Sequence, residues 1–108
     1  SAASDVYKRQ GNGTYGAANA VSIECGFYPL LVMVSSSSSS HYWAVRGFDK
    51  FYYNNNRENE MTWGDTGVSW YYPQDDQYYS PSGNQMNTID TTYYYLVLGY
   101  SNDGEQGN

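Results

Sequence analysis

The sequence predicts an all-β protein, an antiparallel β-sandwich of about 6–8 strands with a jelly-roll-like or lectin-like arrangement. Aromatic residues make up 19% of the chain and charged residues only 15%, a composition that favours strands built from amphipathic side chains. Short apolar or alternating runs are separated by turn signals at roughly the 8–12-residue spacing typical of sandwiches and barrels. No segment has the periodicity of an amphipathic helix.

The chain of 108 residues has room for one domain with one hydrophobic core, which we place at residues 11–100. Residues 101–108 are polar and are expected to form a flexible C-terminal tail. Residues 1–10 (SAASDVYKRQ) differ from the rest in composition and resemble the translated sequencing-adapter read-through at the ends of reading frames assembled from environmental DNA. We therefore expect them to be non-native, to lie outside the fold, and to interrupt a larger protein that continued upstream. The alternative is a genuine polar N-terminal arm.

Two strands are expected early in the domain. Residues 20–25 alternate between apolar and polar side chains, which is the period of a half-buried strand. Cys25 continues this alternation as a small core residue. Pro29 then interrupts the ladder, because it lacks an N–H group. The continuous apolar run at residues 30–34 fits a buried strand.

Strand character returns after the six serines of residues 35–40, which are expected to form a flexible loop. Residues 41–48 are predicted to pair with the strand before the serines as a hairpin. Residues 51–53 form a short strand that ends in an asparagine-rich turn. Residues 60–63 and 68–72 are joined by Gly-Asp-Thr-Gly and form a second hairpin.

The final strand, residues 92–100, is apolar on both faces and carries neither charge nor proline. An open edge with this composition invites aggregation, so we place this strand in the centre of a sheet or beneath a partner subunit. Residues 73–83 are predicted to be an ordered surface loop, and residues 85–88 a short strand. The expected core residues are Val21, Ile23, Phe27, Val32, Trp63, Trp70, Leu96 and Leu98.

Charge and ligand types exclude several functions. A net charge of −6, with no basic cluster beyond Lys8 and Arg9, disfavours nucleic acid as a partner. One cysteine and one histidine provide no zinc spacing, and we expect no metal or cofactor. No run approaches the ~20 apolar residues that span a bilayer, so membrane insertion is not expected. His41 follows a serine loop that would not hold a catalytic geometry, and the protein is predicted not to be an enzyme.

Tyrosine doublets flanked by amides and carboxylates point to ligand binding, because tyrosine offers flat apolar area with a polar tip. Sugars are recognised by such rings together with side chains that bind hydroxyl groups. The alternative is that alternation simply turns one ring of each doublet inward. Adjacent carboxylates in a loop rarely reach across a sugar ring as a glycosidase pair does. The candidate ligand-binding residues are Tyr52, Tyr53, Asn54, Asn55, Tyr71, Asp75, Asp76, Tyr78 and Tyr79.

The order of motifs resembles the C-terminal module of tail-fibre or minor structural proteins of phages and prophages in gut Firmicutes. The motifs are GNGTYG at residues 11–16, the strand running into Phe27–Pro29, the tryptophan hairpin, Gln85-Met86-Asn87 and the closing tyrosine-rich strand. The resemblance implies a β-sandwich at the tip of a virion fibre, often trimeric, that is made in the bacterial cytoplasm and contacts the host surface. It implies receptor binding to a cell-surface glycan, fibre trimerisation, or both. The alternative is a purely structural assembly module, and a polysaccharide depolymerase is a remote third.

Overall fold

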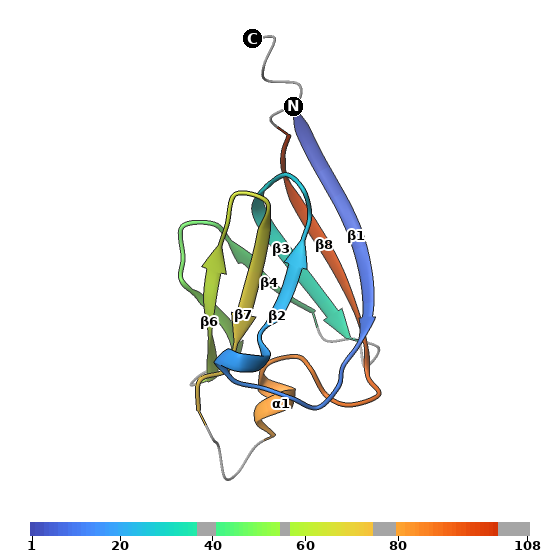
Figure 1. Cartoon of the computed structure of the whole chain (residues 1–108), viewed down its shortest axis with the longest axis vertical. Coiled ribbons are helices and arrows are strands. Elements are labelled where there is room, and N and C mark those ends of the chain that lie inside the picture. Colours follow the sequence, from blue (N-terminus) through green and yellow to red (C-terminus); the bar gives the residue numbers. More distant parts are fainter. Residues whose placement is uncertain (37–40, 55–56, 75–79, 102–108) are drawn as a thin grey trace.

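Two four-stranded antiparallel sheets pack face to face in the computed structural model of the protein (Figure 1). The structure describes residues 1–36, 41–54, 57–74 and 80–101. One sheet has the strand order β1–β8–β3–β4 and the other β2–β7–β6–β5. The predicted all-β sandwich is therefore confirmed. The elements are β1 (Ala2–Gln10), the 3-10 turn η1 (Ala17–Asn19), β2 (Val21–Glu24), β3 (Tyr28–Ser36), β4 (His41–Val45), β5 (Lys50–Asn54), β6 (Arg57–Trp63), β7 (Gly67–Tyr71), α1 (Pro81–Asn84) and β8 (Thr92–Tyr100).

Both predicted hairpins are present. β3 pairs with β4, so that Val32 lies opposite Ala44, and β6 pairs with β7, so that Met61 lies opposite Trp70. β8 lies between β1 and β3, away from the edges of its sheet, as expected for a strand that is apolar on both faces. β1 pairs with β8 and β2 with β7, which nests the first strands against the last, as in jelly rolls.

Three local features differ from expectation. Residues 2–10, expected outside the fold, form β1 along β8, because β8 otherwise leaves a row of unpaired backbone groups. The expected strand at residues 85–88 is wrong, because these residues form a turn and irregular structure after the helical turn α1. Pro81 stands at the start of α1, and the Ser80 hydroxyl accepts from the Gly83 N–H group at 3.1 Å. Pro29 lies within β3, and the ladder accommodates it by a register shift before Leu31.

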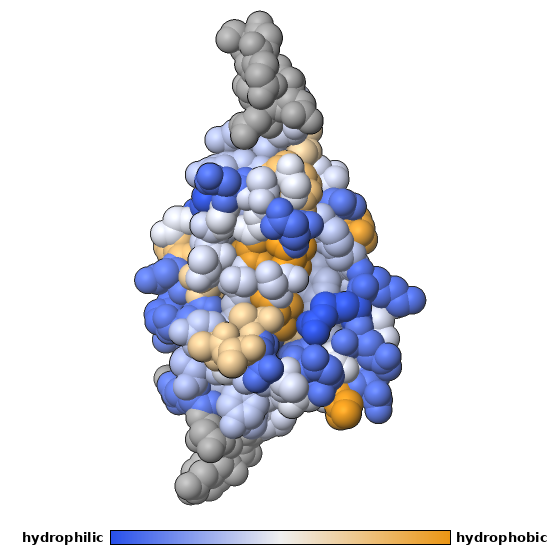
Figure 2. Space-filling model, in the orientation of Figure 1, coloured by the Kyte–Doolittle hydropathy of each residue, from blue (hydrophilic) through white to orange (hydrophobic). Residues whose placement is uncertain are grey.

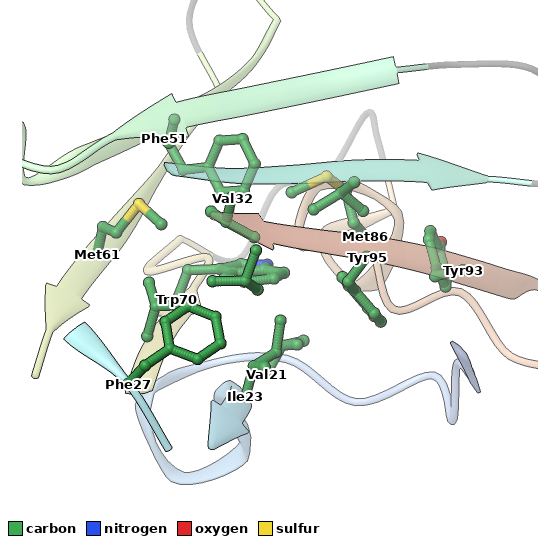
Figure 3. Close-up of a cluster of buried hydrophobic side chains, with 14 residues drawn as sticks. Val21, Ile23, Phe27, Val32, Phe51, Met61, Trp70, Met86, Tyr93 and Tyr95 are labelled. Atoms are coloured by element: carbon green, nitrogen blue, oxygen red, sulfur yellow. The ribbon is translucent and has the colours of Figure 1, made fainter. Parts of the chain in front are cut away.

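Trp70 lies in the middle of the core, with none of its surface exposed. Its ring centroid lies 5.2 Å from that of Phe51 on β5 and 5.9 Å from that of Tyr95 on β8, so it touches both sheets. Figure 3 shows the surrounding side chains converging on this space from β2, β3, β6 and β8. Aromatic rings at these separations add to the stabilisation that apolar burial provides.

The eight expected core residues differ in how deeply they are buried. Five are buried: Val21, Ile23, Phe27, Val32 and Trp70. Trp63 is half-buried and packs against this core. The structure instead places Leu96 and Leu98 on the outer face of the first sheet, where Leu98 is 39% exposed. Both faces of β8 are apolar, and the side of Tyr93, Tyr95 and Val97 is the one that is buried.

A buried polar side chain, Gln85, ties the loops to the sandwich. Its Oε1 atom accepts from the N–H groups of Gly16 and Tyr72, at 2.9 and 2.7 Å, and its Nε2 atom donates to the Asn19 carbonyl at 2.9 Å. The Gln85 carbonyl accepts from the Trp70 indole at 2.9 Å. The side chain of one residue thus satisfies three backbone groups, two in the turn at Gly16–Asn19 and one at Tyr72.

We predict that Trp70→Ala lowers the free energy of unfolding by about 3–5 kcal/mol, as expected for a large-to-small change in a packed core. Urea denaturation followed by circular dichroism measures this. The matched control is Phe48→Ala, because Phe48 is 68% exposed and its removal should change stability by less than about 1 kcal/mol. Equal stability of the Trp70 variant and the parent would contradict the central position of Trp70.

We predict that Gln85→Ala destabilises the domain by at least about 2 kcal/mol, because two N–H groups and one carbonyl lose their partners in a buried site. Gln74→Ala is the control, since Gln74 is exposed. Thermal unfolding of both variants and the parent tests this. A Gln85 variant that melts with the Gln74 variant would show that the backbone groups find other partners.

Candidate interaction surfaces

The predicted ligand-binding residues that the structure describes belong to two strands of one sheet. Tyr52, Tyr53 and Asn54 belong to β5, whereas Tyr71 belongs to β7 and is half-buried. β6 lies between these two strands. The other five predicted residues, Asn55, Asp75, Asp76, Tyr78 and Tyr79, lie outside the described residues.

The outer face of the β1–β8–β3–β4 sheet carries aligned apolar side chains from all four strands. Val6 lies opposite Leu96, Leu96 opposite Met33, and Met33 opposite Trp43. In the next row, Leu98 lies opposite Leu31 and Leu31 opposite Val45. We call this surface the apolar face, and it comprises Val6, Leu31, Met33, Trp43, Val45, Tyr94, Leu96, Leu98 and Tyr100.

Much of the apolar face is open to solvent. Val6 is 68% exposed, Trp43 64%, and Tyr94 45%. Scattered apolar residues on a surface need no explanation, but aligned rows that cross a whole sheet are typical of an interaction site. The charged or titratable residues of the face lie at its border, where Lys8 and His41 end the row of Tyr94 and Ser35.

The outer face of the second sheet is different. Ser22 lies opposite Ser69 and Ser69 opposite Thr62, which gives a row of hydroxyl groups across three strands. Glu24 lies opposite Gly67 and Glu60 opposite Tyr71, so these two carboxylates stand towards opposite ends of β7. Figure 2 shows one side of the molecule, where hydrophilic side chains dominate and hydrophobic surface is limited to a central band and small patches at the margins. The two sheets therefore present chemically different outer faces.

A groove lies beside the apolar face, where the edge strands β4 and β5 meet. It encloses about 420 Å³ and is lined by Trp43, Ala44, Val45, Phe48, Asp49, Lys50 and Glu58. Trp43 and Phe48 supply two large aromatic side chains, each more than 60% exposed. Two carboxylates and an ammonium group line the same space, so it offers both stacking and hydrogen-bonding groups.

The loop that carries Phe48 is held in place by its neighbours. The Arg46 guanidinium donates to the carbonyls of Pro29 and Gly64, each at 3.0 Å, and lies 3.7 Å from the centre of the Tyr28 ring. The Trp63 indole donates to the Phe48 carbonyl at 3.0 Å. An exposed aromatic side chain on a fixed backbone binds ligand with less loss of conformational entropy than a mobile one.

One charged group of the groove is paired with a residue outside the groove lining. Lys50 forms an ion pair with Glu60 on the adjacent strand, and this hydrogen bond raises the pKa of the Lys50 ammonium group. Lys50 therefore stays a cation throughout the physiological pH range. The carboxylates that line the groove are those of Asp49 and Glu58.

The side chains of Ser35, His41, Tyr7 and Cys25 carry groups that act in catalysis in other proteins. The Ser35 hydroxyl lies 2.7 Å from Nδ1 of His41, a contact that follows from their pairing across β3 and β4. Burial raises the pKa of Tyr7 to about 12, with Asp5 contributing, so this phenol stays protonated and is no base at neutral pH. Cys25 is half-buried, and its Sγ atom lies 3.2 Å from the Phe27 carbonyl. Across the described ranges, no three His, Cys, Asp or Glu side chains are grouped as metal ligands.

The sequence indicated an apolar outer side of the last strand, but neither the extent of the apolar face nor the groove. The apolar face depends on strand register, which aligns residues separated by up to 90 positions (Val6 and Leu96). The groove depends on the Arg46 and Trp63 contacts that leave Phe48 exposed. Its one local signal was the pair of large aromatic residues at positions 43 and 48, separated by Ala-Val-Arg-Gly.

Within the described parts of the chain, no helix has both the length and the apolar character needed to cross a bilayer. Comparison with known proteins adds no assignment: no protein-family model, no curated protein and no solved structure gives a significant match to this chain.

Proposed function

We propose that this domain is a non-catalytic assembly module of a phage or prophage tail fibre, in which copies of the domain pack together through the apolar face. The observation that carries the proposal is the alignment of exposed Val6, Met33 and Trp43 with Leu96 across four strands. A surface of this kind lowers its free energy when it is covered. The resemblance of the sequence to fibre-tip modules suggests three copies.

The charge distribution of the chain allows a second copy to cover this face. The chain carries a net charge of −6, so two copies repel one another over most approaches. None of the described residues on the apolar face is acidic. Copies that meet there bring together apolar rows without placing carboxylates opposite each other, and closed symmetry lets the same patch serve every subunit.

We predict that the protein self-associates at micromolar concentration and that the double variant Met33→Lys/Leu98→Lys is monomeric. Two ammonium groups in the contact should raise the dissociation constant at least 100-fold, about 2.8 kcal/mol. Light scattering after size-exclusion chromatography, over a range of protein concentrations, measures the mass. Ile89→Lys is the control, because Ile89 is 62% exposed and lies outside the apolar face. A parent protein that stays monomeric to about 100 μM would contradict the proposal.

The groove favours a second function, recognition of a cell-surface glycan. Trp43 and Phe48 offer flat rings on which a pyranose can stack, and Asp49, Glu58 and Lys50 can bind its hydroxyl groups. The fixed loop around Phe48 supports this role. Here the binding site lies at the β4–β5 junction, in addition to the tyrosine and asparagine residues predicted from the sequence.

We predict that the protein binds a bacterial surface polysaccharide and that Phe48→Ala weakens this binding at least tenfold, roughly 1.4 kcal/mol, through loss of ring stacking. A glycan array covering cell-wall and capsular fragments identifies the sugar, and calorimetry with that sugar gives the affinity. Ile89→Ala should bind like the parent. Because Phe48 lies outside the apolar face, its replacement should leave the mass of the assembly unchanged. Binding that survives in the Phe48 variant would exclude the groove as the site.

A further inference from the structure

The edge of β8 is paired along its whole length with β1. Nine residues of β1 lie opposite nine of β8, from Ala2 opposite Tyr100 to Gln10 opposite Thr92, and the Ser101 N–H group extends the pairing to the Ser1 carbonyl at 2.8 Å. We propose that this edge is a strand-accepting site that recognises peptide backbone, so that an extended, proline-free peptide from another molecule can occupy the position of β1. The proposal does not involve the groove, and it shares one residue, Val6 of β1, with the apolar face.

The side chains of β1 contribute little to holding it. None of the nine is buried, and Val6, at the centre of the strand, is 68% exposed. Ala3 and Tyr7 pack partly against the core, and Arg9 reaches the Tyr95 hydroxyl at 3.4 Å. β1 is therefore held mainly by its backbone hydrogen bonds to β8, which almost any proline-free sequence can form. In β-strand addition, main-chain hydrogen bonds of this kind supply the affinity.

The rest of the sandwich does not need β1 for its core. Tyr93, Tyr95 and Val97 of β8 are buried, and β8 is paired with β3 on its other edge. The inner face of β8 is therefore covered by the opposite sheet. Removal of β1 leaves an open edge that carries no charge and no proline, a surface that readily pairs with another strand.

The loop that leads out of β1 is anchored independently of that strand. The Gly11 N–H group donates to the Thr91 carbonyl at 2.8 Å, and the Gly11 carbonyl accepts from the backbone N–H group of Asp90 at 3.1 Å. A Cβ atom at this position would lie 2.0 Å from the Thr88 carbonyl oxygen, so the corner requires glycine. The Gly13 N–H group also donates to the Asn87 carbonyl at 2.8 Å. β1 can therefore leave the edge of β8 while residues 11–13 stay in place.

Two full-length variants test the proposal. Asp5→Pro/Val6→Pro places prolines at consecutive positions of β1, where one of the two N–H groups must face β8, because N–H groups alternate in direction along a strand. This variant should vacate the edge. The second variant keeps the composition of residues 2–10 but shuffles their order, and it should melt within about 5 °C of the parent.

The probes are two fluorescently labelled synthetic peptides, one with the sequence of residues 2–10 and one with that sequence shuffled. Fluorescence anisotropy measures their binding to the proline variant, and amide exchange measures the protection of β8. We expect both peptides to bind with affinities within about threefold of each other and to restore slow exchange in β8. The parent protein should bind neither, because its own β1 fills the edge.

Binding of the unshuffled peptide alone would overturn the proposal, since side chains would then be recognised. Binding of neither peptide to the folded proline variant would overturn it as well. If the proline variant does not fold, the melting temperature of the shuffled full-length variant tests the proposal instead. A melting temperature close to that of the parent supports backbone recognition, and loss of its cooperative unfolding overturns it.

Discussion

The complete burial of Trp70 is the constraint on which the rest of the structure depends. From the centre of one sheet this side chain contacts Phe51 and reaches Tyr95 of the opposite sheet, so it sets how the two sheets pack. Its indole N–H group, which would be costly to bury without a partner, is satisfied by the Gln85 carbonyl. The Gln85 side chain then fixes backbone groups of Gly16 and Tyr72. Core packing and loop positions are thus coupled through one residue.

β8 divides its side chains in an unexpected way. The amphipathic rings of Tyr93 and Tyr95 are buried, while Leu98, which has no polar group, is partly exposed. A buried tyrosine can use its hydroxyl group, as Tyr93 does when it accepts from the Thr88 N–H group at 3.0 Å. The leucine side gains nothing from water and is stabilised only when something covers it. This asymmetry gives the first sheet an outer face suited to association and leaves the hydroxyl-rich outer face of the second sheet in solvent.

Trp43 and Val45 belong to both the apolar face and the groove, so the two proposed functions meet at these two residues. Association through the apolar face would cover part of Trp43 and bring the groove to the boundary between subunits. Phe48 would remain as an exposed ring, because its loop is fixed from the other side by Arg46 and Trp63.

The sequence by itself determined both hairpins and the strands from β2 to β8, though not β1, because alternation and turn residues act over a few neighbouring positions. The bounds of β8 and the hairpins on either side of the serine run and of Gly64–Gly67 were predictable for this reason. The sequence did not determine which face of β8 is buried, since both faces are apolar, nor that Gln85 lies in the interior with its amide satisfied by distant loops. Only the tertiary structure brought Val6, Leu96, Met33 and Trp43 into one row. That row is set by pairing between residues far apart in the chain, which no local pattern encodes.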